Sequence, residues 1–166
     1  MSQMIDGVWT TEMPTATPTS GRFARARTVF HGIISADGLS GHKTKAGCYH
    51  LYAAHACPRT HRTMMVRKLK RLEAAISVSV VDPIMGEGGG HFGDQRGGIP
   101  DSVHGPLYLR DVYVKACSGH TGRVTVPVLW DRAEHTIVNN ASADVIRMFR
   151  SFACSTRRSR VSAMTA

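Results

Sequence analysis

Two neighbouring segments of the chain carry the apolar patterns of a strand and a helix. The run over residues 48–53 is short, apolar and aromatic, which predicts a strand. From Pro58 to about residue 72 a helical pattern follows, and proline suits the first helical position because its missing N–H is no loss there. Three apolar residues of this helix fall at i, i+4 and i+7 and predict one apolar face: Met65, Leu69 and Leu72.

A second strand is predicted directly after this helix. Three β-branched residues alternate with two serines and lead into Val81 and Asp82: Ile76, Val78 and Val80. A strand, a helix and a strand at this spacing predict a right-handed crossover between two parallel strands. A further helix is predicted over residues 107–116, with Leu109, Val112 and Tyr113 on one side.

The last third of the chain predicts a hairpin followed by a helix. The apolar run Val124–Trp130 predicts a strand, although Pro127 within it cannot donate to a strand ladder. A cis bond between Val126 and Pro127 would expose the preceding backbone to a ligand. Residues 136–138 pair back, and a helix begins near Ser142 with three apolar residues close in sequence: Val145, Ile146 and Phe149. The order βαβ, α, ββα predicts an α/β protein with thioredoxin-like topology.

The composition divides the chain into three regions. Residues 1–40 are rich in Thr, Pro, Gly and Ser and predict a flexible arm, residues 41–150 hold the predicted strands and helices, and residues 151–166 predict a basic tail. For three closely spaced arginines of the arm, a solvated basic surface is favoured over nucleic-acid binding: Arg22, Arg25 and Arg27.

A glycine cluster, MGEGGGH, lies in the poorly patterned stretch from Pro83 to Pro106. His91 stands where the phosphate-binding pattern GxGxxG requires its third glycine, and no strand leads directly into a helix here. We therefore interpret the cluster as a flexible loop rather than a nucleotide site.

Charge and cysteine content limit the classes of partner and compartment. The 166 residues carry a net charge of +9, which favours anionic partners without choosing among them. No apolar run approaches the ~20 residues of a membrane span, and the N-terminus has no secretory signal pattern. The four cysteines are scattered and show no metal-binding spacing, so we expect a reducing, cytoplasmic location and no metal.

Cys57 is the candidate reactive residue. It precedes Pro58 and so falls at the N-cap of the predicted helix, where unpaired backbone N–H groups and the helix dipole favour a thiolate. The thiolate is the nucleophilic form of cysteine. The alternative is a half-buried structural cysteine that happens to precede a proline.

Several long segments carry a family resemblance: LYAAHACPRTHRTMMVRKLKRLE, ISVSVVDPIMGE and GRVTVPVLWDRAEHTIVNNASADVIRMF. From about Val29 to Phe149 the chain resembles the N-terminal half of the glutathionyl-hydroquinone reductases, the Xi-class, omega-like branch of the glutathione transferases. The resemblance implies their thioredoxin-like glutathione-binding domain without their all-helical C-terminal domain.

The resemblance also implies a site. Cys57 would attack the sulfur of a glutathionylated hydroquinone or small thiol conjugate, release the hydroquinone and hold glutathione as a mixed disulfide that a second glutathione resolves. The Val126 backbone, ahead of Pro127, would pair with the cysteinyl unit of glutathione. Ser142 would bind the γ-glutamyl carboxylate with the helix N-terminus, and Arg59 would attract carboxylates or stabilise the thiolate.

Three departures from the family pattern bear on activity. The family's Cys-Pro-Trp ends in Arg59 here, its Gly-Trp pair is Gly89–Gly90, and its Glu-Ser pair is Ala141–Ser142. A truncated, catalytically weak or inactive glutathione transferase fragment therefore stays open as an alternative to a glutathione-dependent thiol transferase or reductase. The net charge of +9 leaves a third alternative, a basic nucleic-acid-binding protein, which no recognisable motif supports. An exposed apolar helix face would also favour a homodimer.

Overall fold

The computed structural model describes residues 3–11, 28–94, 96–105 and 108–158, and the side chains of these residues as far as Phe152. Three helices and eight strands are formed in these ranges. In chain order they are β1 (Gln3–Ile5), β2 (Val8–Thr10), β3 (Ile33–Ser35), β4 (Gly41–Lys43), β5 (Tyr49–Ala54), α1 (Pro58–Leu69), β6 (Ile76–Val81), α2 (Leu109–Ala116), β7 (Val128–Asp131), β8 (Thr136–Asn139) and α3 (Ser142–Arg158).

A four-stranded sheet with the order β6-β5-β7-β8 forms the centre of the molecule. β5 and β6 are parallel, with Tyr49 opposite Ile76 and Ala54 opposite Val81, and α1 is the crossover between them. β7 runs antiparallel to β5, and β8 runs antiparallel to β7 as the predicted hairpin. The thioredoxin-like α/β topology predicted from the sequence is confirmed.

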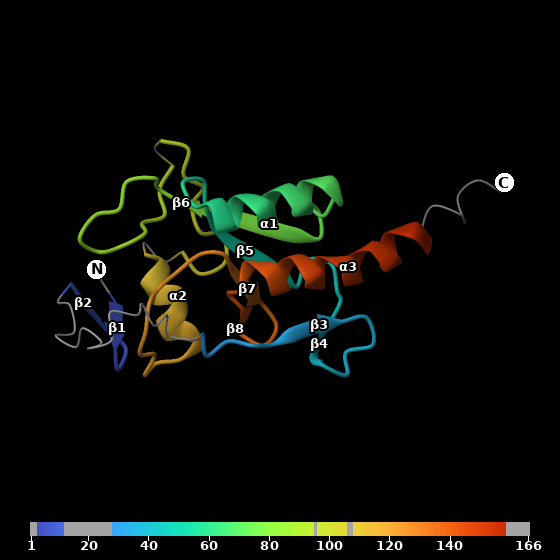
Figure 1. Cartoon of the computed structure of the whole chain (residues 1–166), viewed down its shortest axis with the longest axis horizontal. Coiled ribbons are helices and arrows are strands. Elements are labelled where there is room, and N and C mark those ends of the chain that lie inside the picture. Colours follow the sequence, from blue (N-terminus) through green and yellow to red (C-terminus); the bar gives the residue numbers. More distant parts are fainter. Residues whose placement is uncertain (1–2, 12–27, 95, 106–107, 159–166) are drawn as a thin grey trace, which may run out of the picture.

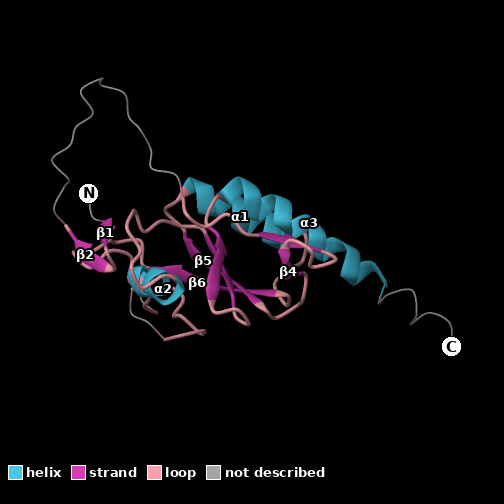
Figure 2. Cartoon of the chain, turned by 90° about the horizontal axis from the view of Figure 1, so that it is seen from below, coloured by secondary structure: helices cyan, strands magenta, loops and turns pink. Residues whose placement is uncertain are grey.

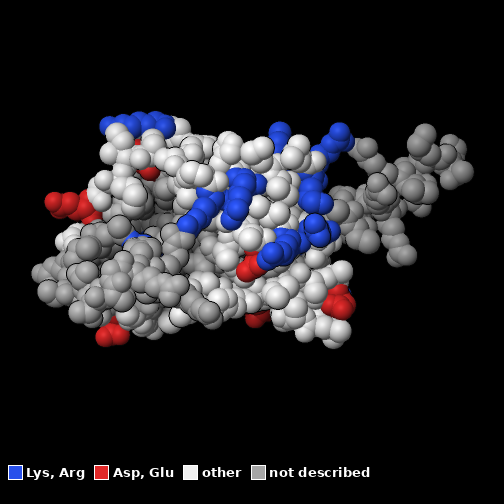
Figure 3. Space-filling model, viewed as in Figure 1, with Lys and Arg blue, Asp and Glu red and all other residues white. Residues whose placement is uncertain are grey.

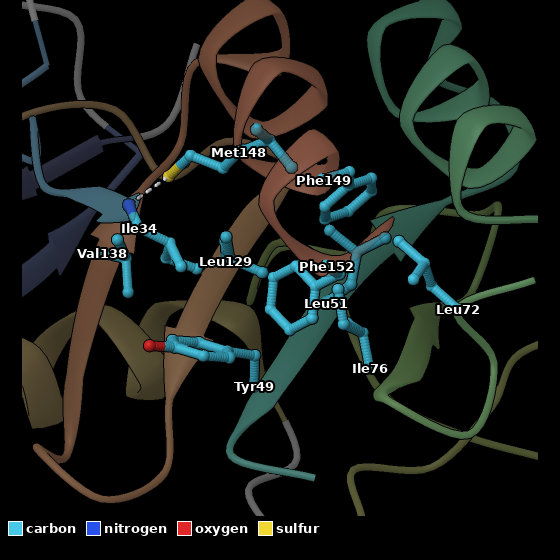
Figure 4. Close-up of a cluster of buried hydrophobic side chains, with 11 residues drawn as sticks. Ile34, Tyr49, Leu51, Leu72, Ile76, Leu129, Val138, Met148, Phe149 and Phe152 are labelled. Carbon is cyan, nitrogen blue, oxygen red and sulfur yellow. Dashed lines mark hydrogen bonds between the residues drawn. The ribbon is translucent and has the colours of Figure 1, made fainter. Parts of the chain in front are cut away.

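Helices cover both faces of the sheet. α1 and α3 lie side by side on one face and α2 lies on the other (Figures 1 and 2). Because successive strand residues point to opposite faces, Leu51 and Leu129 join the core beneath α1 and α3, whereas Tyr52 and Val128 join the core beneath α2. Figure 4 shows the first of these cores, to which α3 contributes Val145, Met148, Phe149 and Phe152.

The predicted apolar face of the first helix is wrong. Met65 is 50% exposed and Leu69 is 78% exposed, while Thr60 and Thr63 are the buried residues of α1. Leu72 is buried, but it lies beyond the end of the helix and reaches the core through a turn. Met65 and Leu69 therefore lie on the exposed side of the helix, and only Leu72, outside the helix, is part of the core.

The N-terminal segment contributes to the core, although the sequence analysis assigned residues 1–40 to an arm. Met4, in the antiparallel hairpin β1–β2, is buried and exchanges backbone hydrogen bonds of 2.8 and 2.9 Å with Gly122. Ile34 in β3 is also buried, against α3. Strands of only three residues leave too short a local pattern to be recognised. The three arginines of the predicted arm lie outside the described residues.

The C-terminal helix is longer than the sequence analysis expected. A basic tail was predicted from Ser151, yet α3 continues to Arg158. Phe152 is buried and packs edge-on against Tyr49, with 5.6 Å between the ring centroids. Val145, Met148, Phe149 and Phe152 occupy i, i+3, i+4 and i+7, so the helical period continues past the point where the basic composition suggested a tail.

Candidate functional site

Cys57 lies at the N-cap of α1, as predicted. β5 ends at Ala54, and the Cys57 N–H donates to the Ala54 carbonyl at 3.2 Å across the turn that leads into the helix. Cys57 has an extended backbone (φ −100°, ψ 114°), and Pro58 occupies the first helical position. The side chain therefore faces the free N–H groups of the first helical turn.

The surroundings of Cys57 favour its thiolate. Burial of this half-buried side chain raises the pKa of the thiol. Hydrogen bonds from Thr60 and from the Arg59 amide, together with the positive charge of Arg59, act in the opposite direction and leave the pKa below its ordinary value. As a thiol, the sulfur donates to the Val126 carbonyl, with 3.9 Å between sulfur and oxygen.

A cavity of about 460 Å³ opens beside Cys57. Its wall brings together residues of α1, α2, β2 and loops that are distant in sequence: Cys57, Arg59, Asp82, Arg110, Val126 and Trp9. Arg59 and Arg110 are the arginines of this wall, so the cavity combines a thiol with two fixed positive charges. Such a cavity suits a small anionic ligand that carries a sulfur atom.

The Val126–Pro127 peptide bond is cis, as the sequence analysis considered. β7 begins at Val128, so Val126 lies ahead of the ladder between β5 and β7. Its carbonyl faces the Cys57 sulfur, while Pro127 is buried behind it. The structure thus brings Cys57, Arg59 and Val126 to one cavity, with Pro127 adjoining them.

Ser142, the fourth predicted glutathione-binding residue, lies apart from this group. It begins α3 as predicted, but it is buried and is not part of the cavity wall. Its hydroxyl accepts hydrogen bonds from Nε (3.0 Å) and Nη2 of Arg62 in α1. The N-terminus of α3 is therefore tied to the helix that Cys57 caps.

Trp9 and Arg110 are site residues that the sequence analysis missed. The Trp9 indole N–H donates to the Glu87 carbonyl at 2.8 Å, although the two residues are 78 positions apart. The Arg110 guanidinium lies over the rings of Trp9 (5.6 Å) and Tyr108 (4.3 Å). Because Trp9 comes from the N-terminal hairpin and Arg110 from α2, no local pattern in the sequence indicates their proximity.

The glycine cluster is packed beneath these aromatic rings. Gly89 has a φ of +87°, and a Cβ at this position would lie 2.9 Å from the Trp9 ring. A second, adjoining cavity of about 790 Å³ shares Trp9, Asp82 and Arg110 with the first. The cluster therefore forms part of the site wall, which its interpretation as a flexible loop did not anticipate.

The described residues contain no group of three or more His, Cys, Asp or Glu side chains placed to hold a metal ion. None of the described helices is both long enough and apolar enough to cross a membrane.

Comparison with known proteins shows relatives over almost the whole chain. The chain is 46% identical to the glutathionyl-hydroquinone reductase YqjG of Escherichia coli over 156 residues, which are 90% of this chain and 48% of that protein. It is 43% identical to the glutathionyl-hydroquinone reductase PcpF of Sphingobium chlorophenolicum, over 91% of this chain and 47% of that protein. No family model matches.

Solved structures agree with the sequence comparison. The structure of a Xi-class glutathione transferase from Natrialba magadii superposes with a TM-score of 0.82 at 45% identity, over 92% of this chain and 46% of that one. The chain is homologous to the N-terminal half of the Xi-class glutathione transferases. The glutathione-bound structure of E. coli YqjG superposes with a TM-score of 0.76 at 40% identity, over 93% of this chain and 46% of that chain. The chain thus spans about half the length of the curated relatives it matches, and the predicted resemblance is confirmed.

Proposed function

We propose that this protein is a glutathione-dependent thiol transferase that reduces S-glutathionyl-hydroquinones through a mixed disulfide between Cys57 and glutathione. The observation that carries the proposal is the placement of Cys57. Cys57 is a nucleophile at a helix N-terminus, and its pKa is lowered. It lies in a cavity large enough for glutathione. The glutathionyl-hydroquinone reductases named above support the choice of substrate class.

In the first step the Cys57 thiolate attacks the glutathione sulfur of the conjugate. An S–S bond forms between Cys57 and glutathione, and the bond between that sulfur and the aromatic ring carbon breaks. The electron pair of the broken bond passes to the ring carbon, which takes a proton, so the hydroquinone is reduced while the two sulfurs are oxidised. A second glutathione thiolate then attacks the mixed disulfide, which releases oxidised glutathione and regenerates the Cys57 thiolate.

Positive charges and backbone groups would orient glutathione for this attack. Glutathione has two carboxylates, and the cavity wall presents Arg59 and Arg110. The Val126 backbone would pair with the cysteinyl unit, next to the sulfur that Cys57 attacks. The family resemblance assigns the γ-glutamyl carboxylate to Ser142 and the N-terminus of α3; Ser142 lies outside the cavity wall, with Arg62 as a further donor beside it.

The same chemistry extends to small glutathionylated thiols. It also bears on the cellular location that we propose. Cys48, Cys57 and Cys117 are free thiols. A nucleophilic Cys57 needs a reducing compartment, so we place the protein in the cytoplasm.

Turnover of an S-glutathionyl-hydroquinone in the presence of glutathione tests this function. The release of hydroquinone, followed by chromatography, should be lost in Cys57→Ser and kept in Cys117→Ser, because Cys117 is an exposed thiol and is not part of the cavity wall. Hydroquinone release that persists in Cys57→Ser would refute the proposal, as would the absence of release by the wild-type protein.

A further inference from the structure

Thr60 carries a buried hydroxyl group with no hydrogen-bond partner among the described residues. The residue is fully buried in the first turn of α1, and its Oγ1 forms no hydrogen bond with any described group. Its carbonyl, by contrast, accepts a hydrogen bond of 2.7 Å from the Thr63 hydroxyl. A buried hydroxyl without a partner loses the hydrogen bonds it would make in water, so proteins seldom keep one without a reason.

The unpaired hydroxyl lies next to the Cys57 sulfur. Thr60 is the third residue of the helix that Cys57 caps, and this is the position whose amide and side chain turn back toward the N-cap. Both the amide and the hydroxyl of Thr60 lie on the side of Cys57 where they lower the pKa of its thiol, and so favour its charged form. As a thiol, the sulfur instead donates its proton to the Val126 carbonyl.

We propose that Thr60 is a positioning residue whose hydroxyl donates a hydrogen bond to the Cys57 thiolate and has a partner only in that state. Loss of the thiol proton turns the sulfur from a donor to Val126 into a charged acceptor. The hydroxyl is already buried beside the sulfur, and no existing hydrogen bond of the hydroxyl has to break.

This inference rests on the proposed function and assigns Thr60 to one of its steps. In the mixed disulfide the sulfur of Cys57 is uncharged and is a weak acceptor, so Thr60 is again unpaired. Attack by the second glutathione expels the Cys57 thiolate as leaving group, and Thr60 stabilises that leaving group. Thr60 therefore favours release of glutathione as well as the initial attack.

The other charged groups near Cys57 stay in place when Thr60 is changed. Arg59 of α1, Asp82 after β6 and Arg110 of α2 line the same cavity, and His61 is exposed on α1. A change in the titration of Cys57 in a Thr60 variant would therefore report the hydroxyl itself.

The pH dependence of Cys57 alkylation by iodoacetamide, followed by peptide mass spectrometry, tests the proposal without glutathione. In Thr60→Val, which keeps the shape and removes the hydroxyl, the midpoint should rise by roughly one pH unit. Thr60→Ser should restore the wild-type midpoint. The melting temperature of Thr60→Val should not fall, because the substitution removes an unpaired buried hydroxyl; Thr60→Ala serves as a second variant if valine prevents folding.

An unchanged midpoint in a folded Thr60→Val or Thr60→Ala protein would overturn the proposal, and so would a Thr60→Ser protein that titrates like Thr60→Val. Failure of the proposed function would look different. The shift between variants would then be present, while none of the proteins, wild type included, would release hydroquinone.

Discussion

His50 shows how this protein buries a titratable residue without charging it. Its ring is fully buried in the sheet, with Nδ1 2.7 Å from the Ser77 hydroxyl and Nε2 3.0 Å from the Ser79 hydroxyl. Burial, followed by the nearby positive charge of Arg132, lowers the pKa of His50 to about 3. The folded protein therefore keeps this histidine neutral over a pH range in which the unfolded chain protonates it.

The stability of the protein should consequently fall in acid. Below the unfolded pKa of 6.5, the unfolded state binds a proton that the folded state refuses, so the free energy of unfolding decreases as the pH falls from about 6.5 toward 3. Urea denaturation should show that the free energy of unfolding falls more between pH 7 and pH 4.5 in the wild type than in His50→Gln. Glutamine keeps hydrogen-bonding groups but does not titrate.

Burial also lowers the pKa values of His104 and His120, which are present in both proteins, so their effect cancels in this comparison. Equal losses of stability in wild type and His50→Gln would show that His50 does not cause the acid sensitivity.

Single residues of the site differ in how far the sequence predicts them. Cys57 was found because a cysteine followed by a proline after a strand is a local pattern. Thr60 was not, because a buried threonine in a first helical turn has no distinctive pattern until its partners are known. Trp9 was missed for a different reason: its contact with Glu87 joins strand β2 to a loop that is far away in sequence.

Among the elements, α3 departs most from expectation. It supplies Val145, Met148, Phe149 and Phe152 to the core beneath α1 and α3 (Figure 4). The basic composition after Ser151 obscured the last of these, although it continues the helical period. The sheet itself was predictable, since β5, β6, β7 and β8 are each marked by apolar or β-branched runs.

Phe152→Ala should destabilise the protein by about 3–5 kcal/mol, because it leaves a cavity in a packed core next to Tyr49. Arg150→Ala, an exposed position of the same helix, should change the free energy of unfolding by less than about 0.5 kcal/mol. Chemical denaturation measures both. A Phe152→Ala protein as stable as the Arg150→Ala protein would mean that α3 does not pack against the sheet beyond Ser151.

At the scale of the whole molecule, the face seen in Figure 3 carries many positive charges. Lysine and arginine side chains lie over α1 and α3 on the face seen in Figure 3, and the chain carries a net charge of +9. Met65 and Leu69 are exposed on α1, whose last turn also carries Arg67 and Lys68. Repulsion between like charges opposes self-association of this surface, whereas its apolar side chains favour it.

Self-association should therefore increase with salt. Raising the ionic strength from 0.1 M to 1 M shortens the screening length from ~10 Å to ~3 Å and removes most of the repulsion. Sedimentation velocity should show more dimer at high salt for the wild type, and less for the double variant Met65→Gln/Leu69→Gln. Leu39→Gln is the matched control, since Leu39 is 90% exposed and belongs to the connection between β3 and β4 rather than to α1. Association that weakens with salt, or that persists in the double variant, would show that this surface is not the site of self-association.

The most direct test of the proposed function is whether Cys57 accepts glutathione. The purified protein is incubated with a small glutathione mixed disulfide, its intact mass is measured and the adduct is mapped by peptide mass spectrometry. We predict one glutathionyl group, on Cys57, that free glutathione removes. No adduct, or adducts distributed equally over Cys48, Cys117 and Cys154, would show that Cys57 is an ordinary thiol and would contradict the proposed function.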